Sequence, residues 1–122
     1  MTRDFEAKAA EVRRARCFAV EATSGWGVDE RKIEAVVGEL AANAYVHARS
    51  AFTVSLARHD HGVSVRVFDQ DAAIPVLCQP ESTDGVGGRG LLIVSRIAVD
   101  WGVEPTGRGK IVWADLTTDE SG

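Results

Sequence analysis

The segment from Asp29 to about Arg49 constrains the fold more than any other part of the sequence, because its apolar residues follow helical spacing without a gap. Steps of three and four residues put such side chains in one stripe along a helix. The stripe consists of Ile33, Val36, Val37, Leu40, Ala41, Ala44 and Ala48. Asp29 is suited to cap the start of this helix, since its carboxylate can accept a hydrogen bond from a first-turn amide. A helix with an apolar stripe is stable only against a second layer, which the rest of the chain must supply.

The rest of the sequence alternates between helical and strand-like patterns. Helical spacing predicts helices, and alternation of apolar with polar residues predicts strands that pair as hairpins. The predicted helices cover residues 4–23, 29–49 and 91–99, and the predicted strands cover residues 52–57, 63–67, 101–104 and 110–117. This order predicts an α+β fold, a two-layer α/β sandwich in which helices cover one face of a mostly antiparallel mixed sheet.

Composition limits the classes of function. The chain has 122 residues, 45% of them hydrophobic, which suits one core, so we expect a single domain over residues 1–122. A formal net charge of −4 provides no global positive field for nucleic acid. No apolar run approaches the roughly 20 residues that a membrane helix needs, so we expect a cytoplasmic protein without direct nucleic-acid or membrane contact. Cys17 and Cys78 stand far apart, which favours two buried thiols over a disulfide or a metal site.

Three polar residues share one face of the predicted helix 29–49. Glu39, Asn43 and His47 are spaced at i, i+4 and i+8, and in angle they border the apolar stripe. At such a position a carboxylate can act as a general base, and an amide oxygen one turn away can bind Mg²⁺. The alternative is a solvated polar edge of a surface helix, which spacing alone favours.

A glycine cluster precedes the predicted helix 91–99. It consists of Gly85, Gly87, Gly88 and Gly90 in D-G-V-G-G-R-G-L-L. Bare amides and the helix dipole could receive phosphate groups here, with Arg89 adding positive charge. The alternative is a flexible linker that caps a helix. The cluster ends a predicted loop of about 20 residues, and a loop of that length in a compact domain is usually functional.

Asp69 follows the second predicted strand, at the start of that loop. A carboxylate there could accept a hydrogen bond from the exocyclic amine of adenine, although a loop-entry Asp is also an ordinary turn residue. His59 and His61 belong to a predicted hairpin turn, and H-x-H without a third ligand is poor support for zinc.

Taken in order, these segments resemble the ATP-binding domain of the GHKL superfamily, which has the Bergerat fold. The resemblance covers residues 8–117 and is to the bacterial branch of anti-sigma-factor serine kinases related to histidine-kinase catalytic domains. The N box of that family resembles V-V-G-E-L-A-A-N-A-Y-V-H-A at residues 36–48. Its glycine box resembles G-R-G-L-L-I-V at 88–94, followed by D-W-G at 100–102 and G-K-I-V-W at 109–113. Four motifs in the same order make the resemblance specific.

The resemblance implies a role for each site residue. Glu39 would serve as general base for the acceptor hydroxyl, and Asn43 would bind the nucleotide through Mg²⁺. Asp69 would bind the adenine amine of ATP. The lid over the phosphates would include Gly88, Arg89 and Gly90. The implied reaction transfers the γ-phosphoryl group of ATP to a serine or threonine of a protein.

The resemblance also implies partners and an assembly. The antagonist of an anti-sigma factor would accept the phosphoryl group, and a sigma factor would be a second partner, so that the outcome would be transcription regulation. Members of this family often form dimers through the first strand and helix, so a homodimer is also implied.

Three departures from the family pattern bear on these expectations. Where relatives have D-x-G-x-G, this chain has D-Q-D-A-A at residues 69–73, which leaves the backbone fewer conformations near the base. The Thr that relatives place in the closing hairpin falls at Ile111. We therefore expect adenine recognition to be weakened or lost. The strand that many relatives have before the first helix is expected to be short or absent, which would leave a sheet edge for a partner or a second copy.

Three hypotheses follow for the function. The first is an ATP- and Mg²⁺-dependent protein serine/threonine kinase that also sequesters a sigma factor. The second is a non-enzymatic interaction module of the same fold that no longer holds ATP. The third is a nucleotide-hydrolysing enzyme without a protein acceptor, in which Glu39 would place a water molecule.

Overall fold

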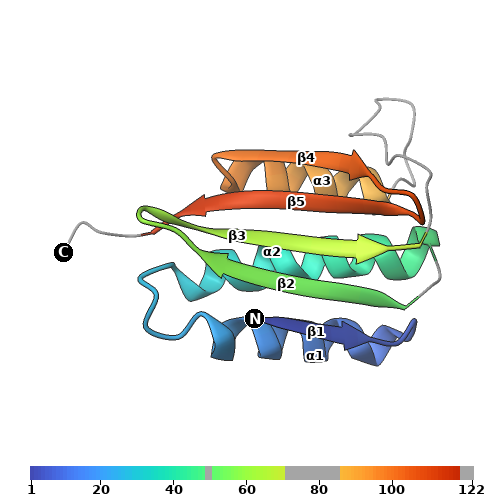
Figure 1. The fold of residues 1–122 in the computed structure, drawn as a ribbon, viewed down its shortest axis with the longest axis horizontal. Helices are drawn as coiled ribbons and strands as arrows, with labels where there is room; N and C mark the ends of the chain where they lie inside the picture. Colours follow the sequence, from blue (N-terminus) through green and yellow to red (C-terminus); the bar gives the residue numbers. More distant parts are fainter. Residues whose placement is uncertain (49–50, 71–85, 119–122) are drawn as a thin grey trace.

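A five-stranded antiparallel sheet with three α-helices on one face forms the structure (Figure 1). The computed structural model describes residues 1–48, 51–70 and 86–118. The strands, which lie in the order β1-β2-β3-β5-β4, are β1 (Thr2–Phe5), β2 (Phe52–Arg58), β3 (Gly62–Asp69), β4 (Asp100–Pro105) and β5 (Lys110–Thr117). The helices are α1 (Ala9–Ala22), α2 (Glu30–Asn43), the π-helix η1 (Ala44–Ala48) and α3 (Val86–Ile97). The predicted two-layer α+β fold is confirmed, and every pair of neighbouring strands in the described residues is antiparallel.

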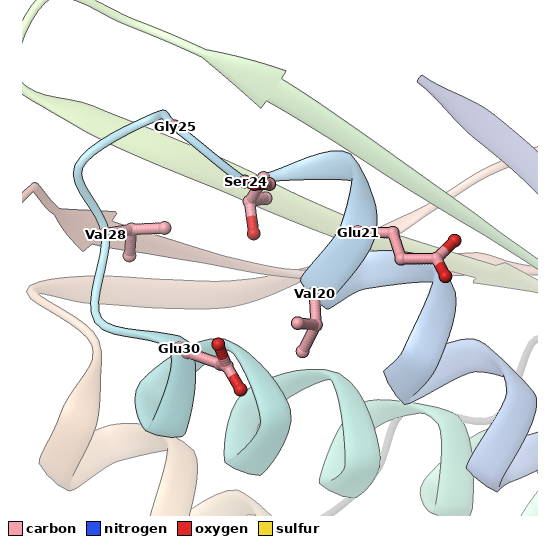
Figure 2. Close-up of a pocket in the computed structure, with 7 residues that line it drawn as sticks. Val20, Glu21, Ser24, Gly25, Val28 and Glu30 are labelled. Carbon is pink, nitrogen blue, oxygen red and sulfur yellow. The ribbon is translucent and has the colours of Figure 1, made fainter.

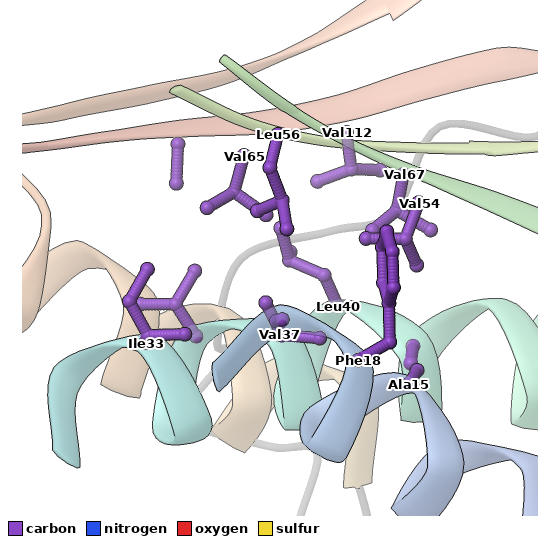
Figure 3. Close-up of a cluster of buried hydrophobic side chains, with 14 of the residues drawn as sticks. Ala15, Phe18, Ile33, Val37, Leu40, Val54, Leu56, Val65, Val67 and Val112 are labelled. Carbon is purple, nitrogen blue, oxygen red and sulfur yellow. The ribbon is translucent and has the colours of Figure 1, made fainter. Parts of the chain in front are cut away.

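The hydrophobic core fills the space between the sheet and the helices (Figure 3). Alternate residues of the central strands face the helices, as the period of two in a strand requires. These residues are Val63, Val65 and Val67 of β3 and Val112, Ala114 and Leu116 of β5, each at most 1% exposed. The predicted stripe of α2 packs against them, with Ile33, Val36 and Val37 fully buried. Burial of each such side chain stabilises the fold by roughly 1.5–3 kcal/mol. Helix α2 contacts both α1 and α3, so it is the central helix of the layer.

The N-terminal segment forms a short strand and then a helix, so the prediction of one helix from residue 4 was wrong. β1 pairs with β2, with Phe5 opposite Phe52. Phe5 is 3% exposed, and its ring stacks on that of Phe52 at 5.4 Å between centroids and lies 6.0 Å from that of Phe18. Helix α1 begins only at Ala9. A first strand of four residues is therefore present, and it covers the edge of β2 that was expected to be open.

Helix α2 begins as predicted. The Asp29 side chain accepts a hydrogen bond from the amide of Arg31 at 2.9 Å, which satisfies one of the free amides of the first turn. After Asn43 the chain continues into η1 without a break. Hydrogen bonds in a π-helix join residues five apart, so the 3.6-residue period of α2 does not continue through η1.

Two further predictions can be compared with the structure. The hairpins β2–β3 and β4–β5 form as predicted. Cys17 is exposed on α1, so its prediction as a buried thiol was wrong, and Cys78 lies outside the described residues. No helix among the described residues is both long and apolar enough to cross a membrane.

Candidate functional site

The predicted site residues are carried by elements that meet at one end of the sheet. Helix α2 runs towards this end and passes into η1 there, β3 ends there, and β5 and α3 begin there (Figure 1). The π-helix η1 packs against β3. Residues 71–85, which lie outside the described residues, join the end of β3 to the start of α3. The structure therefore brings the elements that carry Glu39, Asn43 and Asp69 to the same end as the glycine segment.

Asn43 is a buried polar residue whose side chain has no partner in the described structure. It is the last residue of α2 and is 4% exposed. Neither Oδ1 nor Nδ2 has a hydrogen-bond partner among the described residues. A buried amide that is left unpaired costs about 1–3 kcal/mol for each unsatisfied group, and native structures rarely contain one. Both atoms are therefore suited to a ligand that enters this end of the molecule.

The chemistry of Asn43 fits the magnesium role predicted for it. Mg²⁺ prefers oxygen ligands, usually takes one or two from the protein, and keeps water and phosphate oxygens for the rest. No group of three metal-binding side chains occurs in the part of the chain that the structure describes. A magnesium ion at Asn43 Oδ1 would thus share its shell with a nucleotide and water.

Glu39 lies one helical turn before Asn43 and is half-buried. Residues four apart in a helix lie on the same side of it, so the Glu39 carboxylate projects from the same side of α2 as the Asn43 amide. A carboxylate at the border between core and solvent can receive a proton from a hydroxyl group that is brought to it. This position agrees with the general-base role predicted for Glu39.

Asp69, the last residue of β3, forms a buried ion pair. Lys110 Nζ donates a hydrogen bond to Asp69 Oδ1 at 3.0 Å, and each side chain is 1% exposed. The two residues are directly opposite in the β3–β5 ladder, and both belong to the rows that face the helices. The carboxylate predicted to receive the adenine amine therefore already receives the ammonium group of Lys110.

The residue of the closing hairpin that faces Asp69 is Lys110, and the prediction that Ile111 takes this place was wrong. Ile111 is opposite Phe68. Successive residues of a strand point to opposite faces of the sheet, so the Ile111 side chain lies on the face away from Asp69. Sequence reasoning also missed Lys110 as a site residue. The signal was a lysine at the head of an alternating row that continues with buried Val112 and Ala114.

Gly109 lets the backbone of the closing hairpin approach the end of β3. A Cβ atom at this position would lie 2.0 Å from the carbonyl oxygen of Asp69 and 2.7 Å from the Cα of Gln70. Both are backbone atoms, so neither can move aside without a shift of the strand. The absence of a side chain at Gly109 thus sets the distance across which Lys110 reaches Asp69.

Three glycines of the cluster, Gly87, Gly88 and Gly90, lie inside α3 and not in a loop before a helix, and Gly85 lies outside the described residues. Because α3 begins at Val86, the backbone of Gly88, Arg89 and Gly90 is helical. The prediction that the helix begins at Leu91 was wrong, since packing of α3 on α2 and burial of Val94 outweigh the low helix propensity of glycine. The first amides of a helix have no partner within it and can bind a phosphate group. In a helix that begins at Val86, the amides without a helical partner include those of Val86, Gly87 and Gly88, whereas Arg89 and Gly90 lie beyond the first turn, so of the three predicted phosphate contacts only Gly88 remains a candidate through its amide.

A hollow of about 450 Å³ lies at the other end of the molecule, where α1 connects to α2 (Figure 1, Figure 2). Figure 2 shows the carboxylates of Glu21 and Glu30 beside it, together with Ser24. None of the residues that line this hollow is cationic. The two carboxylates would repel a triphosphate. A nucleoside triphosphate therefore fits the end that carries Asn43 better than this hollow.

A second polar cluster lies on the sheet face away from the helices. Ser64 Oγ donates to Asp115 Oδ1 at 2.7 Å, and His59 Nε2 lies 2.5 Å from the same Ser64 oxygen. A hydroxyl has one proton, so Nε2 must be the donor in the second hydrogen bond. In this arrangement His59 cannot remove the proton of Ser64. The three residues therefore do not form an activated nucleophile.

Comparison with known families agrees with this geometry. The model of the family described as "Histidine kinase-like ATPase domain" matches residues 5–116. The match includes α2, the end of β3, α3 and the closing hairpin. No curated protein matches the chain.

Proposed function

Because this chain belongs to the histidine kinase-like ATPase domain family, we propose that it is an ATP- and Mg²⁺-binding cytoplasmic regulator with serine/threonine kinase activity. In this proposal it is an anti-sigma factor that binds a sigma factor and phosphorylates the antagonist protein. The observation that carries the proposal is Asn43, a buried amide without a partner in the described residues, one turn after the half-buried Glu39.

The reaction forms a bond between the acceptor hydroxyl oxygen and the γ-phosphorus of ATP and breaks the bond from that phosphorus to the bridging oxygen, which leaves with ADP. Bound Mg²⁺ supplies neutralisation of phosphate charge. Asn43 would hold the metal through Oδ1, and the first amides of α3 would contact the phosphates. Glu39 would accept the proton of the acceptor hydroxyl as the new bond forms.

The first test is binding of ATP with and without Mg²⁺, measured by calorimetry on the wild type and on Asn43→Ala. Saturable binding that requires Mg²⁺ and is lost in Asn43→Ala supports the proposal. Absence of binding to the folded wild type at millimolar ATP would overturn the kinase function.

Glu39→Gln separates chemistry from binding. The amide keeps the shape of the carboxylate but cannot take a proton, so transfer of the γ-phosphoryl group to the antagonist protein should fall by at least about 100-fold, while calorimetry shows unchanged binding of Mg²⁺·ATP. Glu34→Gln is the matched control, because Glu34 is an exposed glutamate on the same helix. Equal loss in both variants would count against Glu39 as the base.

A second candidate is the non-enzymatic interaction module of the same fold. The observation in its favour is the ion pair between Asp69 and Lys110, which occupies the carboxylate expected to bind adenine. In this case Glu39→Ala would leave the protein unchanged in every assay, because there would be no transfer to lose. The kinase predicts loss of transfer with partner binding retained.

A further inference from the structure

The ion pair between Asp69 and Lys110 determines what the carboxylate can still recognise. The ammonium group of Lys110 lies 3.0 Å from Asp69 Oδ1, and both side chains are 1% exposed. A hydrogen bond between two ionised groups is about twice as strong as one between neutral groups. Because the pair is buried, water cannot hydrogen-bond to either charged group if the two groups separate, so separation is costly.

An adenine amine is a weaker competitor for this carboxylate than the ammonium group. The exocyclic amine of adenine is a neutral donor. To donate a hydrogen bond to Asp69 Oδ1, the adenine amine would have to displace the ammonium group of Lys110, which the register of β3 and β5 holds opposite Asp69. Displacement would also leave the Lys110 charge buried without its counter-ion. Lys110 thus neutralises the charge of Asp69 and holds one of its two oxygens before any base arrives, so a neutral amine gains less from this carboxylate than from one without a cationic partner.

The other recognition groups that the described residues place at this end suit a metal ion and phosphate groups, which carry no information about the base. The Asn43 amide suits a metal ion, and the first amides of α3 suit phosphate oxygens. Every nucleoside triphosphate carries the same triphosphate and binds the same metal. These groups therefore provide affinity without distinguishing one base from another.

We propose that Lys110 is a specificity-determining residue: by occupying Asp69 it removes the selection for adenine, so that the site binds nucleoside triphosphates through metal and phosphates regardless of the base. The inference rests on the proposed nucleotide-binding function and names its substrate class. Lys110 acts on the base through Asp69, so it is a positioning residue and takes no part in phosphoryl transfer.

The experiment compares the dissociation constants of ATP and GTP, each with Mg²⁺, by calorimetry on the wild type, Lys110→Thr and Lys110→Arg. For the wild type we expect the two constants to agree within about threefold. Lys110→Thr frees the carboxylate, so its preference for ATP over GTP should rise by about tenfold or more, as expected for one hydrogen bond to a charged group. Lys110→Arg retains the charge and should behave like the wild type.

Each outcome decides the inference. A wild type that prefers ATP about tenfold or more overturns it, even if Lys110→Thr does not fold. An ATP:GTP ratio that is unchanged in a folded Lys110→Thr also overturns it, while the kinase function survives if ATP still binds. If the folded wild type binds neither nucleotide, the inference and the kinase function both fail, whatever Lys110→Thr binds. If no variant binds either nucleotide, both are overturned.

Discussion

Gly109 packs against the backbone of the last residue of β3, which makes it the position in the closing hairpin that tolerates a side chain least. For Gly109→Ala we expect the free energy of unfolding to fall by about 2–3 kcal/mol, because the new methyl group would overlap the Asp69 carbonyl oxygen and force the strand to shift. Urea unfolding measures the change. Gly107→Ala is the matched control in the same turn, since no atom lies within 4 Å of the added Cβ. A similar loss in both variants would show that glycine matters here for chain flexibility and not for close contact.

The ion pair between Asp69 and Lys110 contributes little to the net stability of the fold. The cost of removing two charges from water often offsets their attraction, so a buried pair adds little net stability compared with apolar side chains of the same size. Lys110 is the first of the β5 residues that face the helices, and the next ones, Val112, Ala114 and Leu116, are all apolar. An apolar residue at position 110 would therefore suit the same face of the strand. The pair lies at the end of the sheet where Asn43 is also buried.

At the scale of elements, β1 is a short edge strand that is held by one aromatic cluster. For Phe5→Ala we expect a loss of about 3–5 kcal/mol in the free energy of unfolding, because the ring is buried between those of Phe18 and Phe52. Val99→Ala is the control, since Val99 is 64% exposed, and it should cost less than about 0.5 kcal/mol. Unfolding in urea, followed by circular dichroism, measures both. A loss below about 1 kcal/mol for Phe5→Ala would mean that β1 separates from the sheet before the rest unfolds.

Helix α3 begins with the weakest helical residues of the chain. Glycine costs about 1 kcal/mol relative to alanine at an interior helix position, and Gly87, Gly88 and Gly90 all lie in the first part of this helix. Burial of Val94 in the core holds the later part. The start of α3 is therefore stabilised by the packing of the rest of the helix.

At the scale of the whole molecule, one core joins the sheet to all three helices, so a ligand at one end should stabilise the entire fold. At a free concentration 100 times the dissociation constant, Mg²⁺·ATP should add about 2.7 kcal/mol and raise the melting temperature by roughly 10 °C. Asn43→Leu should lose this increase. Without nucleotide the same variant should melt no lower than the wild type, because leucine removes the unpaired amide.

Scanning calorimetry with and without Mg²⁺·ATP measures these shifts. Glu39→Gln is the control, because it should keep the full increase. A melting temperature of Asn43→Leu well below that of the wild type without nucleotide would assign Asn43 a structural role in place of the metal site.

The sequence by itself determined the elements whose signals are local. Helix α2 has a complete apolar stripe and its own cap at Asp29, and large apolar residues occupy every second position over residues 52–56 of β2 and 63–67 of β3. Their periods of 3.6 and 2 appear within a few residues, so no distant contact is needed to predict them. Glu39, Asn43 and Asp69 were predicted as site residues from the resemblance of their segments to family motifs, because spacing alone favoured an ordinary polar edge for Glu39 and Asn43.

Only the tertiary structure decided the features that depend on residues far apart in the chain. Phe5 fits the spacing of a helix, but pairing with Phe52 makes it part of a strand. The glycines of α3 favour a loop locally, but contact with α2 makes them helical. The register between β3 and β5 places Lys110, and not Ile111, opposite Asp69. A shift of one residue reverses the face to which a side chain points, and that register is set by the packing of the whole sheet against its helices.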